Sequence, residues 1–404
     1  MKFNRRKFIG ATATGVVALS LPKISVGLPK ISVKDPPIPF DPWIEVDSEA
    51  IKYNIRQLYS LSNNRPIIAV VKNNGYGLGA ELVSQILQDS PEVMGLAAVK
   101  AESCLSLRKS GLKKPILHMG MVTDDEALDL VSNDIQVSIS NPDSPRQFTS
   151  IAEKLNKPVS GHIYLDTGMS RMGIPYQKAA PIIENLLQNQ KIQIQGAFSG
   201  LTEDSEYDRE QLKRLKDLNG KIKSKKLSMG VLHMASSQAV YHFKDSHLDA
   251  VRPGMSIYGG YPTDGQIEEK MGVLKVGFKL KARVVRVEQL REGDSVSYGR
   301  KYVADKPTWI ATLPIGHADG YPRNAVKGAK VLIGDRLYPV IGAVSASHTI
   351  LEIGSEPSVK IGDVATLYGS EDPSVNPNHI SATIGTSIYD IYMHLNPKLP
   401  KKLV

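Results

Sequence analysis

The central part of the chain alternates short apolar runs with longer amphipathic stretches, and this repetition limits the possible folds more than any other feature. Eight apolar runs rich in β-branched residues lie at 66–71, 94–99, 115–119, 135–139, 161–165, 194–198, 230–233 and 248–251. Helical spacing of apolar residues follows many of them, as at 101–110, 124–132, 145–155, 178–187 and 208–222. Eight strand–helix units predict a TIM-like (β/α)8 barrel over 49–272. A doubly wound open sheet is the alternative, but no glycine-rich dinucleotide loop is present to support it.

The pattern changes near residue 273, where strands follow one another without long helices between them. Runs with strand character lie at 280–287, 308–313, 330–333, 337–341, 349–352 and 364–368, separated by Gly, Asp and Pro turns. This spacing predicts a mostly β domain over 273–404. The alternating segment 43–47, within 37–48, is expected to form a strand that pairs with this second domain.

The first 36 residues have the composition of a targeting signal followed by a linker. Residues 1–34 contain seven basic side chains and no acidic one, so the formal charge of +9 falls to +2 for the remainder. The chain after residue 34 is therefore close to neutral, and we expect no electrostatic attraction to nucleic acid. Arg5 and Arg6, followed by an aromatic–aliphatic pair and a mildly apolar run, resemble a twin-arginine export signal and predict a periplasmic protein.

Other interpretations of this segment remain open. A basic tail beside a core helix would leave the protein in the cytoplasm, and a Sec signal is a further alternative. No apolar run in the chain approaches the ~18–20 residues that a membrane-spanning helix needs, so we expect no stable membrane span.

A lysine stands at the end of the first barrel strand, where barrel enzymes place their chemistry. The run 67–71 leads directly into Lys72-Asn-Asn-Gly-Tyr76. Partial desolvation at a strand end lowers the pKa of an ammonium group and suits it to Schiff-base chemistry. Tyr76 and the glycines after it could hold a phosphate. A lysine at this position can also simply extend to solvent.

Three further groups of polar residues follow other barrel strands. Arg252-Pro-Gly254 ends the eighth run, and His233 begins a string that reaches Ser237 after the seventh. Phosphate sites in barrels are often built after these two strands. Arg171 follows the fifth run and could bind a carboxylate with both guanidinium nitrogens. Each group alone could equally be an ordinary turn or helix cap.

The β domain contributes three more strings, which are Val296-Ser-Tyr298-Gly-Arg300, Gly316-His317-Ala-Asp-Gly320 and Gly385-Thr-Ser-Ile-Tyr389. Together with the barrel strings, and in this order, they resemble the alanine racemase family. The resemblance covers about residues 40–404. It implies a barrel plus a β domain, pyridoxal 5'-phosphate (PLP) as cofactor, and a head-to-tail homodimer whose small-molecule substrates are amino acids.

The resemblance also implies roles for individual residues. Lys72 matches the lysine that carries PLP and is the base on one face of the substrate. Tyr298 matches the base on the opposite face, which the partner chain supplies. Arg252 matches the arginine that faces the pyridine nitrogen, and Arg171 matches the one that orients the substrate carboxylate. The remaining cofactor-binding positions are Tyr76, His233, Ser237, Gly254, Met255 and Tyr389.

Four positions depart from the family pattern. Tyr164 stands where the family usually has a lysine, often carbamylated, and Gly200 replaces the histidine that links the catalytic tyrosine to the cofactor arginine. His233 could take part of that role. Ala346 replaces a methionine near the substrate carboxylate, and His317 replaces a tyrosine at the mouth of the site. Smaller side chains at 200 and 346 suggest a roomier pocket, so we expect activity on alanine and on several larger or basic amino acids.

Two other functions remain possible. Another barrel-type PLP enzyme would be a decarboxylase, an aldolase or a dehydratase, but Arg252 argues against a decarboxylase, and His317 and His348 are too isolated to form the metal site of the others. A PLP-binding carrier with weakened catalysis is the second, and the loss of the histidine at Gly200 is its best support.

Overall fold

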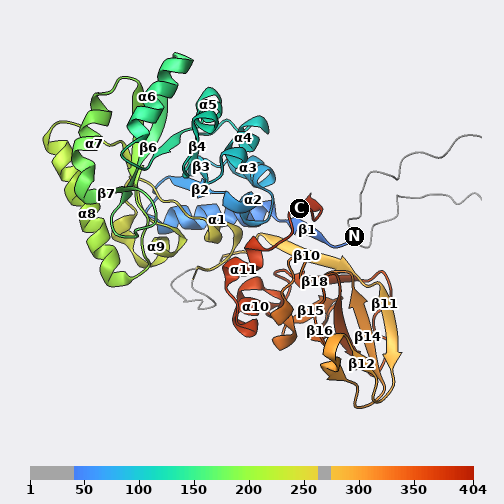
Figure 1. Cartoon of the computed structure of the whole chain (residues 1–404). Helices are drawn as coiled ribbons and strands as arrows, with labels where there is room; N and C mark the ends of the chain where they lie inside the picture. The colour runs from blue at the N-terminus through green and yellow to red at the C-terminus, as the bar shows by residue number, and fades with distance from the viewer. Residues whose placement is uncertain (1–40, 263–273) are drawn as a thin grey trace, which may run out of the picture. The chain divides into compact units, whose positions relative to one another are not determined.

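In the first half of the described part of the chain, parallel strands form a closed ring (Figure 1). The computed structural model describes residues 41–262 and 274–404, so the export signal expected over 1–36 lies outside the described residues. The ring strands are β2 (Ile67–Val70), β3 (Val93–Ala98), β4 (Ile116–His118), β5 (Val137–Ile139), β6 (Val159–Asp166), β8 (Ile192–Phe198) and β9 (Val231–His233). Parallel bridges close its gaps at the pairs Leu117–Gln136, His233–Ala250 and Ile67–Val251. A short strand, β7 (Ile174–Pro175), pairs with β6.

The eighth barrel strand is shorter than the sequence predicts. Only Ala250 and Val251 of the run 248–251 make strand bridges. Leu248 has φ +52°, a left-handed conformation that interrupts extended pairing. The barrel nevertheless closes, because Val251 bridges back to the first strand.

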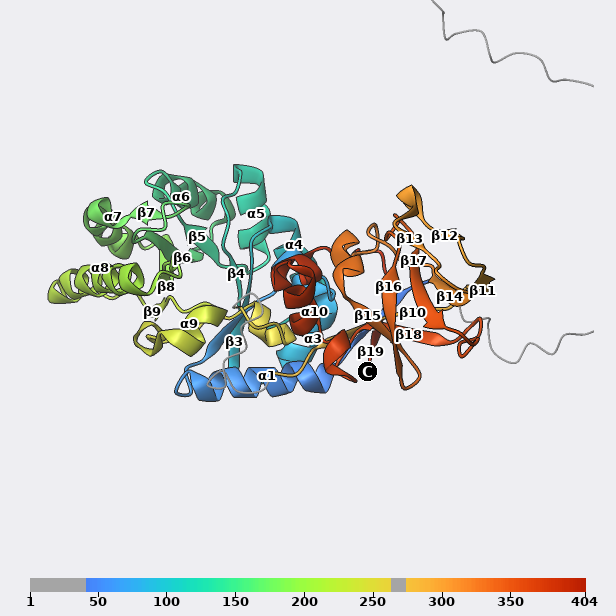
Figure 2. The same cartoon turned by 90° about the horizontal axis from the view of Figure 1, so that it is seen from below.

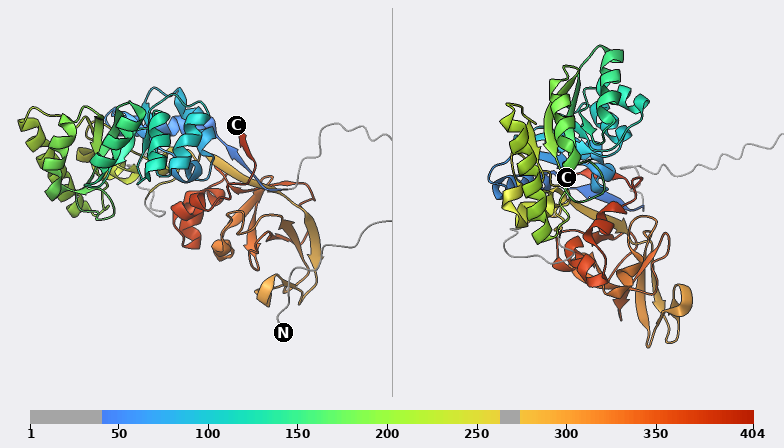
Figure 3. Two further views of the ribbon diagram at one scale, coloured as in Figure 1. Left: turned by 45° about the horizontal axis from the view of Figure 1, so that its top comes forward. Right: turned by 60° about the vertical axis from the view of Figure 1, so that its left-hand side comes forward.

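Helices surround this ring, as Figure 1 and the further views in Figure 3 show. They are α1 (Ser48–Leu61), α3 (Ala80–Gln88), α4 (Ala101–Lys109), α5 (Asp124–Ser132), α6 (Ser144–Leu155), α7 (Tyr176–Gln188), α8 (Ser205–Ser224) and α9 (Ser237–His242), with the 3-10 turns η1 (Lys244–Ser246) and η2 (Met255–Tyr258). In α8 the Asp204 side chain caps the first turn, and Leu212, Leu215, Leu218 and Ile222 form one buried stripe. Helical spacing of apolar residues thus places one face of each helix on the core.

The second half of the chain is a mostly antiparallel sheet (Figure 2). Its order is β11-β14-β17-β16-β15-β18-β10-β1-β19. The strands are β1 (Trp43–Val46), β10 (Phe278–Arg283), β11 (Arg286–Leu290), β14 (Thr308–Leu313), β15 (Lys330–Ile333), β16 (Arg336–Ile341), β17 (Thr349–Gly354), β18 (Val364–Tyr368) and β19 (Lys401–Leu403). A small hairpin pairs β12 (Ser295–Val296) with β13 (Tyr302–Val303). The remaining elements are η4 (Tyr298–Arg300), η5 (Arg323–Lys327), η6 (Pro373–Val375), α10 (Pro377–Ile384) and α11 (Ile388–Met393).

The predicted fold class is confirmed, with an α/β barrel followed by a mostly β domain. Strand β1 precedes the barrel in sequence but pairs antiparallel with β10 and parallel with β19. In the described part of the chain, no helix has the length and apolar character needed to cross a membrane.

Candidate active site

Lys72 lies two residues after the end of β2, at the start of α2 (Lys72–Tyr76), and lines a cavity of about 440 Å³. Its side chain is half-buried. Burial disfavours the ammonium and lowers the pKa of Lys72, and the nearby cations Arg171 and Arg252 lower it further. A lysine with a lowered pKa spends more time as the neutral amine, which is the form that attacks a carbonyl carbon.

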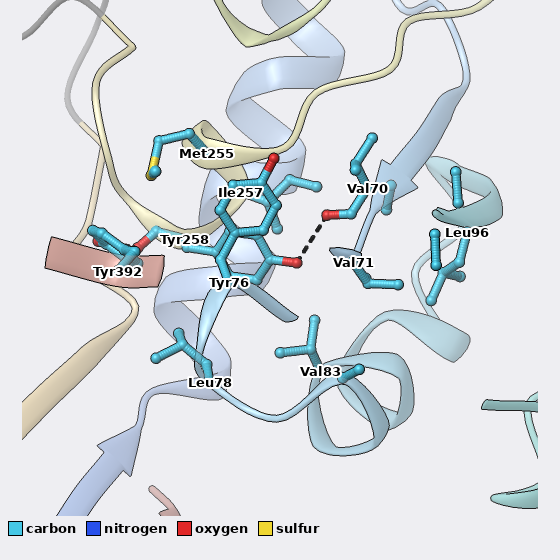
Figure 4. Packing of buried hydrophobic residues seen from close by; sticks show 14 of the residues in the cluster. Val70, Val71, Tyr76, Leu78, Val83, Leu96, Met255, Ile257, Tyr258 and Tyr392 are labelled. Atoms are coloured by element: carbon cyan, nitrogen blue, oxygen red, sulfur yellow. Dashed lines mark hydrogen bonds between the residues drawn. The ribbon is translucent and has the colours of Figure 1, made fainter. Parts of the chain in front are cut away.

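The turn after Lys72 is left-handed and is part of α2 (Lys72–Tyr76). Its residues 73–76 have φ values of 51°, 56°, 61° and 54°. Such angles cost about 1–2 kcal/mol per ordinary residue but less for asparagine and glycine, which are three of these four. Packing holds the fourth, Tyr76, because the centre of its ring lies 4.8 Å from the centre of the Tyr258 ring (Figure 4). The Tyr258 hydroxyl in turn donates to the Val70 carbonyl at 3.0 Å.

Residues with hydroxyl groups, Ser236, Ser237 and Tyr389, line the same cavity beside Tyr76. The Ser237 hydroxyl accepts the backbone N–H of Gly254 at 2.9 Å. A Cβ built on Gly254 would lie 2.1 Å from the Tyr76 hydroxyl oxygen, so this close approach needs glycine. The Ser236 hydroxyl is buried without a protein partner among the described residues. Met255 completes this lining. Hydroxyl donors that converge on one cavity suit a phosphate group.

Arg252 lies at the head of a buried chain of hydrogen bonds. Its guanidinium donates to the Ser199 carbonyl at 2.9 Å and to His233 Nδ1 at 2.7 Å. His233 Nε2 lies 2.9 Å from His162 Nδ1, and His162 Nε2 lies 3.1 Å from the side-chain oxygen Oε1 of Gln136. A guanidinium can only donate, so each imidazole must be neutral and carry its proton on Nε2. Burial and the charge of Arg252 lower the pKa of both histidines, that of His162 to about 4.

An aromatic stack also supports Arg252. The guanidinium lies 5.0 Å from the centre of the Phe198 ring, and Phe198 stacks on Tyr164 at 4.3 Å and on His233 at 5.1 Å. Tyr164, which stands where the family usually has a lysine, thus belongs to the packing around the arginine. Burial lowers the pKa of Arg252 to about 10, so it remains protonated at neutral pH.

Arg171 reaches the cavity from the loop after β6. The Asp166 carboxylate shapes this loop by accepting the backbone N–H groups of Gly168 at 2.9 Å and Ser170 at 3.0 Å. On the neighbouring loop, the nearest atom to a Cβ built on Gly200 would be the Met169 sulfur at 3.1 Å. Even a Cβ at position 200 would therefore crowd the Met169 sulfur, so the Met169 side chain would have to shift to admit a histidine there.

Of the predicted site residues in the β domain, Tyr389 lines this cavity in its own chain, whereas Tyr298 and Ala346 do not. Tyr298 is 76% exposed and is not among the described residues that line the cavity, and neither is Ala346. Hydrogen bonds join the loops that carry these residues and His317. The Ser297 hydroxyl donates to the Ala343 carbonyl at 3.0 Å, and the His317 backbone N–H donates to the Ser345 carbonyl at 2.9 Å.

His233 differs from the sequence expectation. It was expected to bind cofactor and to take part of the role of the histidine missing at position 200. Instead it is fully buried, and both of its ring nitrogens are occupied by Arg252 and His162. His233 is therefore a positioning residue that acts through Arg252.

Two residues of this buried hydrogen-bond network, His162 and Gln136, are not among the site residues predicted from the sequence. The available signal was alternation along β6, since His162 is two residues before Tyr164 and four before Asp166. Among residues 41–262 and 274–404, no group of three or more His, Cys, Asp or Glu side chains is arranged to hold a metal ion.

Residues 46–262 match the family model described as alanine racemase, N-terminal domain, and residues 277–403 match the alanine racemase, C-terminal domain. Alanine racemase 1 of Clostridium acetobutylicum is 31% identical over 365 residues, covering 89% of this chain and 94% of that protein. Alanine racemase of Methanococcus maripaludis is 30% identical over 366 residues, covering 89% and 97%.

A solved alanine racemase structure also matches most of this chain. The alanine racemase of Clostridium difficile 630 superimposes with a TM-score of 0.84 at 26% identity, covering 91% of this chain and 96% of that one. The two family models together span both halves of the described chain. The chain belongs to the alanine racemase family.

Proposed function

We propose that the protein is a PLP-dependent racemase that interconverts L- and D-alanine and also accepts larger or basic amino acids. The observation that carries the proposal is the convergence of Lys72, Arg171, Arg252 and the hydroxyls beside Gly254 on one cavity. Membership of the alanine racemase family supports the same reaction.

The lining residues fit PLP. The unpartnered Ser236 hydroxyl and the glycine required at 254 suit the phosphate, and Lys72 has the lowered pKa expected of an amine that binds an aldehyde. When bound, PLP supplies an electron sink for the electrons left on Cα after its proton is removed. Arg252 would face the pyridine nitrogen and, because it can only donate, would leave that nitrogen unprotonated.

Lys72 would hold the cofactor and serve as the base on one face of the substrate. Racemisation removes the Cα proton from one face and returns a proton to the other, so two opposed bases accomplish it without moving far. Arg171 would bind the substrate carboxylate through a charge-assisted, bidentate contact and so orient Cα toward Lys72.

The second base would be Tyr298 of the partner subunit. In one chain Tyr298 is exposed and does not line the described cavity, which is what a residue contributed across a head-to-tail dimer requires. Arg171 and Arg252 line the cavity and would stabilise negative charge that develops on the oxygen of this tyrosine during proton transfer. This interaction would replace the help that a histidine at position 200 would give.

Purified protein tests this function directly. Wild-type protein should convert L-alanine to a racemic mixture, followed by the decay of its circular dichroism, and should hold PLP with an absorbance band that is lost in Lys72→Ala. In deuterated solvent, Tyr298→Phe should keep exchange of the Cα proton in one enantiomer and lose it in the other. Bound PLP without turnover of any amino acid would instead identify a carrier.

The proposal includes export by a twin-arginine signal in residues 1–36. Folding before export would allow the cofactor to be captured in the cytoplasm and carried out with the protein. Fractionation of cells tests this, with Arg5→Lys and Arg6→Lys combined expected to retain the protein in the cytoplasm. An unchanged periplasmic fraction in that variant would refute the twin-arginine assignment.

A further inference from the structure

The position of Arg171 at the cavity depends on the backbone of its own loop. Arg171 is exposed, and none of the described residues forms a hydrogen bond or an ion pair with its side chain. A two-point contact with a carboxylate nevertheless requires the guanidinium to be held at a fixed place and angle. The Asp166 carboxylate shapes the loop from within, so contacts from outside the loop decide where it lies.

Those contacts come from one helix, α8 (Ser205–Ser224). We propose that Arg214 and Gln211 of this helix are positioning residues that hold the Arg171 loop and thereby set the affinity for the substrate carboxylate. Neither of them lines the cavity, so each acts through the loop. The inference rests on the proposed function, which makes an amino acid the ligand of Arg171.

Arg214 holds the backbone at the start of the loop. Its guanidinium donates to the Thr167 carbonyl at 2.9 Å, four residues before Arg171. The guanidinium is itself fixed, because it lies 4.8 Å from the centre of the Tyr176 ring and 5.4 Å from that of Tyr207. It also donates to the Glu210 carboxylate at 2.9 Å and to the Tyr207 hydroxyl at 3.1 Å. A donor held in this way keeps the Thr167 carbonyl in one place.

Gln211 joins this loop to the one that follows β8 (Ile192–Phe198). Its side chain is fully buried, and its amide nitrogen donates to the Gly200 carbonyl at 2.9 Å and to the Thr167 hydroxyl at 3.4 Å. Its amide oxygen accepts the backbone N–H of Thr202 at 3.0 Å. The Thr167 hydroxyl also lies 2.8 Å from the Ser199 hydroxyl. Breaking these bonds would leave buried polar groups without partners, so the two loops are held together.

Close packing against α8 supports the same loop. A Cβ built on Gly168 would lie 2.6 Å from the Tyr207 hydroxyl oxygen, so the loop backbone lies directly on this side chain. The helix is a firm support, because the Asp204 side chain caps its first turn and its apolar stripe is buried. A guanidinium carried by a loop is placed more precisely when a packed helix holds that loop.

The two positioning residues differ in how far their contacts reach. The Ser199 carbonyl accepts a hydrogen bond from Arg252 at 2.9 Å, so the network of Gln211 continues to the arginine assigned to the cofactor. The hydrogen bonds of Arg214 go to Thr167, Tyr207 and Glu210 instead. Loss of Arg214 should therefore affect the substrate carboxylate, whereas loss of Gln211 should affect the cofactor as well.

Binding to the holoenzyme tests the inference, with racemic alanine compared with ethylamine, which is alanine without its carboxylate. The absorbance of bound PLP follows both titrations. In Arg214→Gln the Kd for alanine should rise about 5- to 20-fold while the Kd for ethylamine stays unchanged. Arg214→Lys should restore part of the affinity, because an ammonium can still donate to the Thr167 carbonyl.

Arg209→Gln is the matched control, since Arg209 is an exposed arginine of α8 that does not line the cavity. It removes the same charge and should leave both Kd values unchanged. Equal weakening of alanine and ethylamine in Arg214→Gln, or unchanged binding of both, would overturn the inference. Alanine binding without racemisation would refute the proposed function alone, and no alanine binding by the wild-type holoenzyme would refute both.

Cofactor affinity separates the two positioning residues. Titration of apoenzyme with PLP should give a raised Kd in Gln211→Met, whose side chain has a similar length and no hydrogen-bonding amide, and an unchanged Kd in Arg214→Gln. If Arg214→Gln weakened PLP binding as strongly as it weakened alanine binding, α8 would support the barrel as a whole, and the inference would fall. The Arg214 variants decide the inference by themselves if Gln211→Met does not fold.

Discussion

Gly254 is the single residue whose substitution tests the proposed phosphate site most selectively. A Cβ at this position would lie 2.1 Å from the Tyr76 hydroxyl oxygen and 2.8 Å from Tyr76 Cζ, and the Tyr76 ring is buried against Tyr258, which limits how far it can move. Gly254→Ala should therefore raise the Kd for PLP by more than about tenfold, because it pushes apart groups that would contact the phosphate. Titration of apoenzyme with PLP, followed by absorbance, measures the change.

Gly220 provides the matched control. It lies in α8 (Ser205–Ser224), and a Cβ there would meet no atom within 4 Å. Gly220→Ala should stabilise the protein by about 0.5–1 kcal/mol, because alanine loses less conformational freedom than glycine in a helix, and it should leave PLP binding unchanged. Equal PLP affinity in the two variants would remove Gly254 from the cofactor site.

The sequence predicts which residues lie in the candidate site better than it predicts what each of them does. Lys72, Arg171 and Arg252 follow three different strands, and the carboxyl ends of parallel barrel strands meet at one face, so their convergence could be expected. The hydrogen bonds of His233 could not, because they depend on which nitrogen faces Arg252 and on a second histidine 71 positions away. Distance along the chain gives no signal for such a contact.

Strand β6 (Val159–Asp166) carries His162 into the buried chain that ends at Arg252. An unfolded histidine takes up a proton near pH 6.5, whereas burial and Arg252 lower the pKa of His162 to about 4. Between these values the unfolded chain binds more protons, so stability should fall as pH decreases from about 6.5 to 4, by up to ~3 kcal/mol from this residue. Melting temperatures across this range should fall less steeply in His162→Gln.

His379→Gln is the control for that measurement, because His379 is an exposed histidine on α10 (Pro377–Ile384). It should reproduce the pH dependence of the wild type. His162→Gln should also weaken PLP binding, since Arg252 would lose part of its support. Parallel melting curves for wild type and His162→Gln would show that His162 does not stay neutral in the folded protein.

Elements with strong periodicity are predictable here, and elements shaped by contacts are not. The buried stripe of α8 follows directly from its apolar spacing. The left-handed turn at 73–76 is not evident from Asn-Asn-Gly-Tyr, because those residues permit the angles without requiring them. The contact of Tyr76 with Tyr258, which comes from the far end of the barrel sequence, helps to fix the turn.

For the whole molecule, the division of residues between the two domains has a consequence for assembly. The barrel supplies Lys72, Arg171 and Arg252 to the cavity, while Tyr298 of the β domain remains exposed in the same chain. If Tyr298 is the second base, a complete site exists only where two chains meet. The two-base mechanism can then operate only in the dimer.

Mixing two inactive variants tests this account most directly. Lys72→Ala lacks the first base and Tyr298→Phe lacks the second, so each alone should racemise alanine poorly. If active sites are shared, subunit exchange in an equal mixture should restore about one quarter of wild-type activity, since half of the dimers are mixed and each holds one intact site. No recovery, with subunit exchange verified independently, would contradict the claim that Tyr298 of one chain acts at Lys72 of another.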